Sequence, residues 1–452
     1  MTKTSQLDIE TASKIGGDID KDLQWLANII RYQTGDADDE LIARIEERGE
    51  IQPPIIGSES FYGDFIASKS LNAVERGVFI MSVAVHLRPS LFDPLLKKAK
   101  EYQYTDTRFG GIVSDAQIPF LPTGETAIFL LTNGSVEERL IVLEVLSPQH
   151  WLFNEEVLEF NYTDSLLPHT FAGFYLTKDY VQLLTKGVAD KPDYSSNFPA
   201  SLVRVALDWE DLVISQELSK ELKDIENWIR FEESILNSES MSKKIKRGYK
   251  VVFYGPSGTG KTLTAGLIGK KFEKDVYRID LSQVSSKYIG ETEKNLERLF
   301  KQARNKNWIL FFDEGESLFG KRGNSGQSNE RYANQQVGFL LQKIEDHPGV
   351  VILATNLKGN IDEAFLRRFQ KMIYFEAPDA DYRYELWQKA FEGTLPLADD
   401  VDLKQISKAH KLVGGQIVNI VKQSVLRAMG QEMPVLDKRL IHSCIVEEEK
   451  KS

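Results

Sequence analysis

The sequence contains a single cysteine, Cys444, among its 452 residues. One cysteine cannot form an intrachain disulfide, and it has no partner cysteines with which to build a zinc cluster. Both kinds of crosslink are therefore excluded within this chain. The scarcity of cysteine fits a reducing compartment in which burial of apolar surface holds the fold together, so we expect a cytoplasmic protein.

Long hydrophobic runs are also missing. The longest apolar stretch, GVFIMSVAV at residues 77–85, is much shorter than the roughly 18 residues that a membrane-spanning helix needs. The first twenty residues, MTKTSQLDIETASKIGGDID, lack the apolar centre of a signal peptide. The sequence therefore predicts neither a membrane segment nor a secretory leader.

Histidine is rare, and positive charge is in deficit. The six histidines are scattered and form no H-E-x-x-H motif, so an attached zinc protease of that type is excluded and structural roles are expected for all six. They are His86, His150, His169, His347, His410 and His442. The formal net charge of −11 disfavours a general attraction to DNA or RNA, although a local basic patch on one domain remains compatible with it.

The composition, 42% hydrophobic and 27% charged, predicts a globular protein with more than one domain. The polar segment 1–20 and the charged tail 446–452 are expected to be flexible. Residues 21–186 combine helical patterns with apolar runs, GGIV, IPFLPTGETAIFLLTNG and RLIVLEVL, which predict an α+β domain with a β-hairpin. A stretch rich in Gly, Pro and Ser then begins a linker, which we place at 187–206.

After the linker, short apolar strands alternate with helical segments. The strands are VVFY (251–254), VYRIDL (276–281), WILFF (308–312), VVILAT (350–355) and MIYF (372–375). Such alternation predicts an α/β fold in which helices cover both faces of a parallel sheet, here at 207–378. Only helical patterns follow, so a small helical domain is expected at 379–445.

The segment GPSGTGKT directly follows the first of these strands. It satisfies the pattern G-x-x-x-x-G-K-[ST], in which glycines let backbone N–H groups turn toward phosphates and the next helix presents its positive end. Lys261 is expected to reach the β and γ phosphates of ATP, and the Thr262 hydroxyl to hold Mg²⁺. The predicted nucleotide-binding residues are Gly255, Pro256, Ser257, Gly258, Thr259, Gly260, Lys261, Thr262 and Leu263.

Two carboxylates follow the third strand, in WILFFDEGES. Asp313 and Glu314 should lie at the carboxyl edge of the sheet, where open α/β folds bind their ligands. Asp313 is predicted to orient Mg²⁺ and its waters, and Glu314 to polarise the attacking water as a general base. The alternative is a solvated acidic turn, which the phosphate-binding loop upstream disfavours.

Three further polar residues follow the fourth strand. Asn356, in VVILATN, should reach the same edge, where its amide can bind both the water and the γ phosphate. Arg367 and Arg368 follow in DEAFLRRF, before the last strand. Asparagine also favours turns, so a structural role is the alternative for Asn356. For the two arginines the alternative is a solvated surface position without a function.

Residues 207–440 resemble the AAA ATPases, the ring-forming branch of the P-loop proteins. The likeness rests on the order of GPSGTGKT, FFDE, ATN and DEAFLRRF, and on SSKYIGETEKNLERLF, which is similar to the pore segment of protein-threading members such as katanin and spastin. The resemblance implies strand order 5-1-4-3-2, a C-terminal helical lid and a ring that is usually a hexamer. It makes Asn356 the first sensor, and Arg367 and Arg368 arginine fingers that reach a neighbouring subunit.

The same resemblance places Lys287, Tyr288 and Ile289 on the wall of a central pore. There, the Tyr288 ring could grip an extended polypeptide, whereas the alternative is an ordinary core tyrosine. The polar stretch 320–336 resembles the second pore loop, and Arg331 is expected to contact the neighbouring subunit.

Two weaker likenesses concern the nucleotide's surroundings. The segment DWEDLVIS (208–215) resembles the family's lead-in around adenine, with Asp211 and Leu212 as the contacts. The family's second-sensor helix often carries an arginine near its start, where VGGQIVNIV has Gly414 and Gly415 instead, a pair that resembles the Gly-Ala of the remodelling branch. Gly415 is expected to lie beside the nucleotide. Arg427 lies further along that helix and is expected to be structural.

The front region resembles bacterial AAA proteins with a winged-helix-type N-terminal domain, some of which are encoded beside contractile injection systems. The likeness rests on ERGVFIMSVAVHLRPSLFDPLL, HWLF and PASL. The acidic composition and the ordinary frequency of surface lysines favour an adaptor domain for protein partners. DNA binding is the alternative, through Arg88, Lys97, Lys98, Lys100 and Arg108.

Three functions agree with the sequence. The leading one is a Mg²⁺-dependent ATPase ring that remodels or threads proteins, with components of a contractile injection system among the candidate substrates. The second is a DNA-associated loader or helicase on the same scaffold. The third is a nucleotide-gated scaffold without turnover. The acidic composition favours a protein partner over a nucleic acid.

Overall fold

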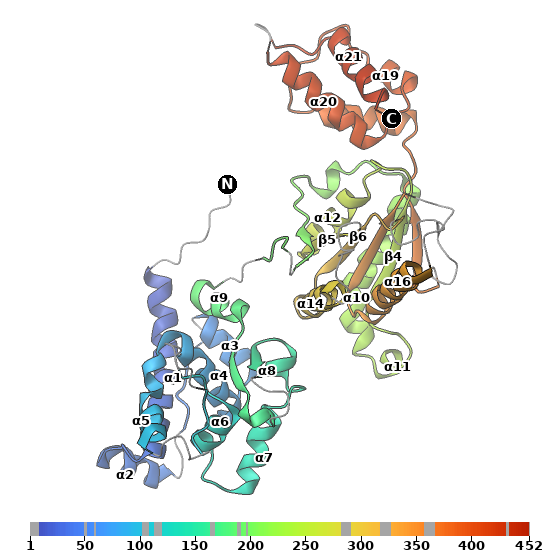
Figure 1. Ribbon diagram of the computed structural model, residues 1–452. Coiled ribbons are helices and arrows are strands. Elements are labelled where there is room, and N and C mark those ends of the chain that lie inside the picture. Colours follow the sequence, from blue (N-terminus) through green and yellow to red (C-terminus); the bar gives the residue numbers. More distant parts are fainter. Residues whose placement is uncertain are drawn as a thin grey trace. The chain divides into compact units, whose positions relative to one another are not determined.

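The computed structural model describes residues 9–48, 52–57, 60–101, 108–112, 120–162, 168–187, 191–195, 198–281, 291–316, 327–356, 367–430 and 434–451 (Figure 1). The chain divides into two compact units, Met1–Asp190 and Lys191–Ser452. One hydrophobic cluster fills the first unit and separate clusters fill the second.

The first unit is mainly helical. Its helices are α1 (Ile9–Thr34), α2 (Asp39–Arg48), α3 (Phe61–Lys69), α4 (Ala73–Leu87), α5 (Asp93–Glu101), α6 (Gly124–Leu131), α7 (Val136–Val145), α8 (Trp151–Asn154) and α9 (Lys178–Lys186), with 3-10 turns η1 (Pro89–Phe92) and η2 (His169–Phe171). Strands β1 (Leu158–Asn161) and β2 (Gly173–Leu176) of this unit pair antiparallel. The unit is thus α+β, as the sequence predicts, while its winged-helix likeness stays a prediction.

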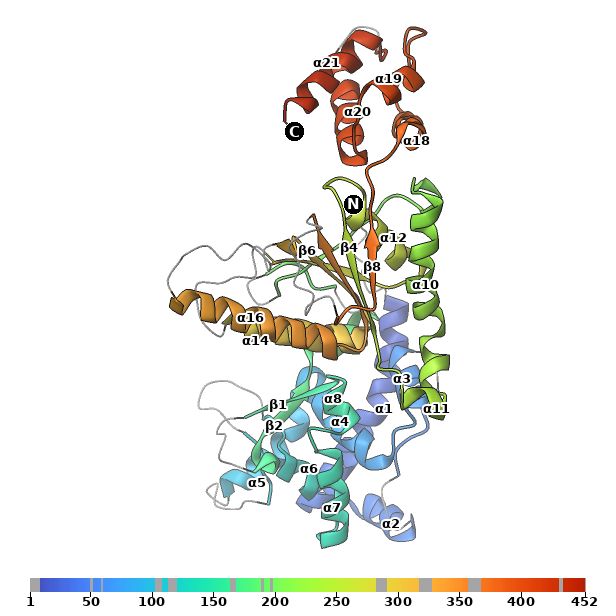
Figure 2. The same ribbon diagram turned by 90° about the vertical axis from the view of Figure 1, so that its right-hand side faces the viewer.

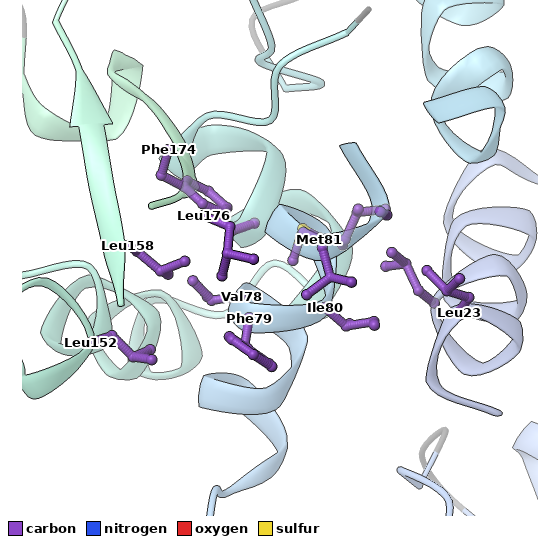
Figure 3. Close-up of a cluster of buried hydrophobic side chains, with 14 of the residues drawn as sticks. Leu23, Val78, Phe79, Ile80, Met81, Leu152, Leu158, Phe174 and Leu176 are labelled. Carbon is purple, nitrogen blue, oxygen red and sulfur yellow. The ribbon is translucent and has the colours of Figure 1, made fainter. Parts of the chain in front are cut away.

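Helix α4 lies in the core of the first unit. Its sequence, AVERGVFIMSVAVHL, is apolar on nearly all sides, which is typical of a helix buried all round. Figure 3 shows the surrounding cluster, with Leu23, Val78, Phe79, Ile80, Met81, Leu152, Leu158, Phe174 and Leu176 labelled. Among the described residues no single helix has the length and apolarity to cross a membrane, although the bent pair of α4 and Pro89–Glu101 passes by length and composition.

Helix α1 begins at Ile9, inside the segment 1–20 that the sequence predicts to be flexible. Ile15 and Ile19 are 7% and 3% exposed and join the core together with Leu23. These residues are four apart, so they lie on one face of the helix. The prediction is wrong for residues 9–20 because one buried aliphatic side chain per turn anchors a helix whose other positions are polar.

The predicted hairpin lies elsewhere than expected. The runs IPFLPTGETAIFLLTNG and RLIVLEVL contain helices α6 and α7, and the hairpin is formed by β1 and β2 instead. Side-chain caps explain the difference: Thr123 and Thr126 form a capping box at the start of α6, and Ser135 accepts a hydrogen bond from Glu138 N at the start of α7. These local caps outweigh the β propensity of the aliphatic residues that follow.

A buried ion pair joins α1 to α4. The Arg76 guanidinium donates two hydrogen bonds to the Asp22 carboxylate, at 2.9 and 2.7 Å, and the Tyr62 hydroxyl donates a third. Burial raises the pKa of Asp22, while the hydrogen bonds from Arg76 and Tyr62 act in the opposite direction. Both charged groups are buried, so each is the counter-ion that neutralises the other.

Replacing Arg76 with methionine is expected to destabilise the first unit by about 3–5 kcal/mol, because the Asp22 carboxylate would lose its buried counter-ion. Hydrogen exchange of the α1 and α4 amides measures this loss as a lower opening free energy. The exposed pair Arg88–Asp20 is the control, and Arg88→Met should cost less than about 1 kcal/mol. Equal protection of the two variants would show that the buried pair contributes no more than the exposed one.

Within its described residues, the second unit is built on a six-stranded sheet. Its strands are β3 (Ser201–Leu202), β4 (Tyr249–Tyr254), β5 (Val276–Asp280), β6 (Ile309–Asp313), β7 (Val350–Thr355) and β8 (Lys371–Tyr374), in the order β3-β5-β6-β7-β4-β8. The pairs among β4 to β8 are parallel. These five are the predicted strands, and their order read from β8 is 5-1-4-3-2, which confirms the prediction.

Helices cover both faces of this sheet. They are α10 (Gln216–Leu236), α12 (Lys261–Lys271), α14 (Glu291–Lys306) and α16 (Gln327–Asp346); the short α11 (Glu239–Ser242) follows α10. Leu310 and Phe312 pack with α14 and α16, whereas Ile309 and Phe311 pack with α10 and α12. Figure 2 shows α14 and α16 on one side of the strands and α10 and α12 on the other. Alternate side chains of β6 thus enter opposite layers, as expected for a covered parallel sheet.

Strand β3 lies within the predicted linker. Ser201 and Leu202 pair antiparallel with Arg278 and Tyr277 of β5. Phe198 is also buried in the core of the second unit. The linker prediction at 187–206 is therefore wrong in its last part. A two-residue edge strand is too short to show the alternating pattern from which strands are predicted.

The chain ends in a helical lid formed by α18 (Ala380–Phe391), α19 (Leu403–Ala409), α20 (Gly414–Ala428) and α21 (Lys438–Glu449). Trp387, Ile417 and Cys444 are fully buried in its core. Arg427 of α20 makes a bidentate ion pair with Glu447 of α21, at 3.0 and 2.6 Å. This pair confirms the structural role expected for Arg427.

Candidate active site

The loop between β4 and α12 holds the predicted phosphate-binding motif. Gly255 has a φ of +143°, and a Cβ there would lie 2.1 Å from the Phe375 carbonyl oxygen, so only glycine fits. Gly258 has a φ of +77° and faces the start of the lid, where Gly415 N donates to Gly258 O at 3.0 Å. The loop is thereby held between the end of the sheet and helix α20.

Lys261 is the first residue of α12, and its side chain is buried beneath the loop. Its Nζ donates to the carbonyl oxygens of Gly255 and Pro256, at 2.8 and 2.9 Å, and to Asn356 Oδ1 at 3.0 Å. Burial lowers the pKa of Lys261, and the nearby carboxylates of Asp313 and Glu316 oppose that shift. A phosphate group would add negative charge beside a cation that water reaches poorly.

The remaining residues of the loop lie at its rim. Pro256 and Ser257 are exposed, and the Thr259 hydroxyl donates to Pro256 O at 2.9 Å. Thr262 and Leu263 are half-buried in the first turn of α12. That helix begins at the loop with no side-chain cap, which leaves its positive end directed at the site.

The two acidic residues lie at the carboxyl end of β6. Asp313 Oδ2 is 2.9 Å from Arg278 Nε of the neighbouring strand β5, and Asp313 Oδ1 accepts a hydrogen bond from Glu314 N at 3.0 Å. Glu314 is exposed and has a φ of +55°, which is uncommon for a residue with a side chain. Such backbone strain is concentrated at functional sites.

Asn356 connects the loop to a third acid that the sequence reasoning missed. Its Nδ2 donates to Glu316 Oε1 at 2.8 Å, and its backbone N donates to Glu316 Oε2 at 3.3 Å. Lys261, Asn356 and Glu316 therefore form one hydrogen-bonded chain across three segments. The segment FFDEGES contains a third acidic residue two positions after Glu314, and this could have predicted that Glu316 lies near the site.

The predicted adenine contacts lie at the 3-10 turn η3 (Trp209–Asp211). The Asp211 carboxylate accepts a hydrogen bond from Asp208 N at 2.8 Å, so this side chain stabilises the turn itself. Leu212 is half-buried at the end of the turn. Lys389 of the lid donates to Glu210 O, which ties the turn to α18.

The structure does not bring Arg367 and Arg368 into this site. Gln370 N donates to Lys250 O at the start of β4, whereas the loop begins at Gly255 beyond the other end of that strand. At about 3.3 Å per residue, Lys250 and Gly255 are about 17 Å apart along the strand. Arg368 Nε lies 3.4 Å from Glu345 Oε2, while Arg367 is exposed and makes no ion pair with any described residue.

The predicted pore segments fall largely outside the part of the chain that the structure describes. Lys287, Tyr288 and Ile289 lie outside the described residues, as does the part of the second pore loop at 320–326. Arg331 falls within helix α16.

The donor set fits ATP with Mg²⁺. The loop has no room for side chains at Gly255, the buried ammonium of Lys261 lies under it, and α12 begins there. The Thr262 hydroxyl and the Asp313 carboxylate supply oxygen, which Mg²⁺ prefers. The described residues contain no separate cluster of His, Cys, Asp and Glu that could hold a metal ion.

Comparison with protein-family models gives one match. Residues 251–377 match the model described as ATPase family associated with various cellular activities (AAA). The matched range extends from β4 to just beyond β8, so it includes the loop, the acids after β6, Asn356 and both arginines.

The chain is also similar to several curated proteins. It is 32% identical to peroxisomal ATPase PEX6 of Debaryomyces hansenii over 51% of this chain and 20% of the relative. It is 30% identical to protein SAV of Sulfolobus acidocaldarius over 53% of this chain and 31% of the relative. It is 33% identical to meiotic spindle formation protein mei-1 of Caenorhabditis elegans over 40% of this chain and 39% of the relative. The chain thus spans between about a fifth and two fifths of the length of these relatives.

Proposed function

We propose that this chain, which carries an AAA ATPase domain in residues 251–377, hydrolyses ATP with Mg²⁺ as part of an oligomeric ring that remodels proteins. The observation that carries the proposal is the position of Lys261. Its buried ammonium lies at the start of α12, and Asn356 joins it to the strand end beside Asp313 and Glu314.

Each residue has a separate task in the proposed reaction. The loop N–H groups and Lys261 bind the β and γ phosphates, and Asn356 orients the γ phosphate and the attacking water. Glu314 polarises that water as the general base. Mg²⁺, held through Thr262 and Asp313, would neutralise charge that develops on the phosphate oxygens.

The separation of the arginines from the loop supports a ring. Arg367 and Arg368 lie near the level where β4 starts, so they do not reach the nucleotide of their own subunit. An arginine supplied in trans would complete the active site, as in other P-loop enzymes. A hexamer is the ring that the sequence resemblance implies.

Charge distribution supports a protein substrate or partner. Residues 1–190 contain 16 Lys and Arg against 29 Asp and Glu, a formal charge of −13, whereas residues 191–452 contain 40 against 38. Arg88, one of the candidate DNA-binding residues, pairs with Asp20, and Lys98 pairs with Glu101. Such an acidic unit repels phosphate backbones, which disfavours the DNA loader. The link to contractile injection systems rests on the sequence resemblance.

Phosphate release is the direct test of turnover. We expect the purified chain to release phosphate from ATP in Mg²⁺. Removal of Mg²⁺ with EDTA should abolish this release, because the charge on the phosphate oxygens and on Asp313 would lose the cation that neutralises it. Readdition of Mg²⁺ in excess should restore the rate. Turnover that persists in EDTA would contradict the proposed metal role, and no turnover at any protein concentration would favour the scaffold.

Replacing Glu316 with alanine is expected to lower kcat by about tenfold and to change KM much less, because Asn356 would lose the acceptor that positions its amide. Glu316→Gln retains an oxygen at the same place, so its loss should be smaller. Steady-state phosphate release by the two variants measures this difference. An equal loss in both variants would show that the carboxylate charge, and not the hydrogen bond to Asn356, is what matters.

A further inference from the structure

Helix α7 of the first unit exposes an unusual number of aliphatic side chains. Val136, Leu140 and Ile141 are 72%, 60% and 54% exposed. They lie on one side of the helix: Val136 and Leu140 form an i, i+4 row, and Ile141 belongs to the adjacent row. Exposed aliphatic clusters bordered by polar groups mark interaction sites in soluble proteins.

The orientation of this face is fixed by the other side of the helix. Val142 and Val145 are buried in the core of the unit. Arg139 makes a bidentate ion pair with Glu125 of α6, at 3.0 and 2.7 Å. Because Ser135 also caps the first turn, α7 cannot turn its aliphatic side chains inward without losing these contacts.

The charges on the exposed face all have one sign. Within α7, all of whose residues are described, the exposed residues are Val136, Glu137, Leu140, Ile141 and Glu144. Glu137 lies four residues before Ile141 and Glu144 lies four residues after Leu140, so each glutamate is next to an exposed aliphatic side chain on the helix surface. The only basic residue of the helix, Arg139, is engaged by Glu125.

We propose that these five residues, the α7 face, form a docking surface for a basic amphipathic helix of a partner protein. Leucine-like side chains of the partner would cover Val136, Leu140 and Ile141, and its Lys or Arg side chains would meet Glu137 and Glu144. The surface extends the partner role proposed for residues 1–190, and it can bind whether or not the second unit turns over ATP.

The charge pattern selects this occupant over two others. A second copy of the chain would bring the same glutamates against Glu137 and Glu144, and like charges at an interface are unfavourable. A membrane surface with anionic lipids would repel an acidic face. A basic partner helix satisfies both the aliphatic and the acidic residues.

The size of the face sets the expected affinity. Helix α7 has 10 residues and is therefore about 15 Å long, so the buried area falls below that of a standard stable interface. A single site should therefore bind weakly, with a Kd of about 10–100 μM, and several sites in one ring would raise the avidity of a multivalent partner.

The test uses the full-length chain and two labelled helical peptides of 14 residues. One carries Leu and Lys on a single face, and the other carries Glu in place of each Lys. Fluorescence anisotropy in low salt should detect binding of the Lys peptide, at least about tenfold weaker binding of the Glu peptide, and weaker binding of the Lys peptide in high salt.

The variant V136S/L140S/I141S keeps the charge of α7 and removes its aliphatic side chains. We expect it to weaken binding of the Lys peptide by at least about tenfold, and E137Q/E144Q to weaken it and reduce its salt dependence. Leu426→Ser is the control, since Leu426 is 73% exposed on α20 of the second unit. Equal binding by the triple variant and the control would overturn the proposal.

Two further measurements separate the possible failures. A sedimentation coefficient that falls in V136S/L140S/I141S would show that a second copy covers the α7 face, which also overturns the proposal. Phosphate release should be the same in all these variants. A protein that binds the Lys peptide through α7 but releases no phosphate would contradict the proposed ATPase and leave the α7 face standing.

Discussion

Glu314→Gln is expected to lower the rate of phosphate release by about 10²–10⁴-fold while ATP still binds. An amide cannot accept the proton of the attacking water, and the loop and Lys261 that hold the phosphates are unchanged. Single-turnover phosphate release measures the chemical step, and calorimetry with ATP measures binding. The two readouts separate loss of the base from loss of the site.

Glu273→Gln is the matched control for this change. Glu273 is also an exposed glutamate with a positive φ, +53°, but it precedes β5 and therefore lies at the opposite edge of the sheet from Glu314. The Glu273→Gln variant should turn over ATP at the wild-type rate. If Glu314→Gln retained most of the wild-type rate, Glu314 would not be the base, and the solvated acidic turn would be the better interpretation of FFDE.

Arg367→Ala is expected to lower turnover in the assembled ring by about 10³–10⁵-fold, the effect of an arginine finger in related enzymes. Arg367 is exposed and makes no ion pair with any described residue, so its guanidinium is available to a neighbouring subunit. Arg368→Ala should lose less, because Arg368 is already paired with Glu345. Arg230, an exposed residue of α10, is the control for removal of a surface arginine.

Mixing two inactive variants tests whether Arg367 acts in trans. Subunits with Lys261→Ala lack the phosphate-binding lysine but still present Arg367, whereas Arg367→Ala subunits keep an intact loop. A mixture should therefore recover part of the activity that neither variant shows alone. A mixture as inactive as its components, in rings shown by sedimentation to be mixed, would place the arginine's role within its own subunit.

Much of the second unit could be predicted because its signals are local. Each parallel strand is a continuous apolar run, and the loop motif directly follows one of them, so the sheet and the placement of Lys261 and Asp313 followed from the sequence. The sequence predicts strands where α6 and α7 form, because single polar residues, Thr123 and Ser135, start these helices ahead of their aliphatic residues.

Arg278 and Glu316 show what the sequence could not provide. Arg278 meets Asp313 only because β5 and β6 are neighbours, with Asp280 in register with Asp313. Glu316 meets Asn356 across 40 residues of chain. Both contacts join side chains on or just after neighbouring strands. The predicted strand order says which strands are neighbours, but it does not say which of their side chains meet.

Calorimetric titration of the purified chain with ATP in Mg²⁺ tests the central claim most directly, namely that the buried ammonium of Lys261 and the surrounding loop bind a triphosphate. We predict saturable binding by the wild type and its loss in Lys261→Ala. A correctly folded wild-type protein that shows no heat of binding, or a Lys261→Ala variant that binds equally well, would contradict the assignment of this site to ATP.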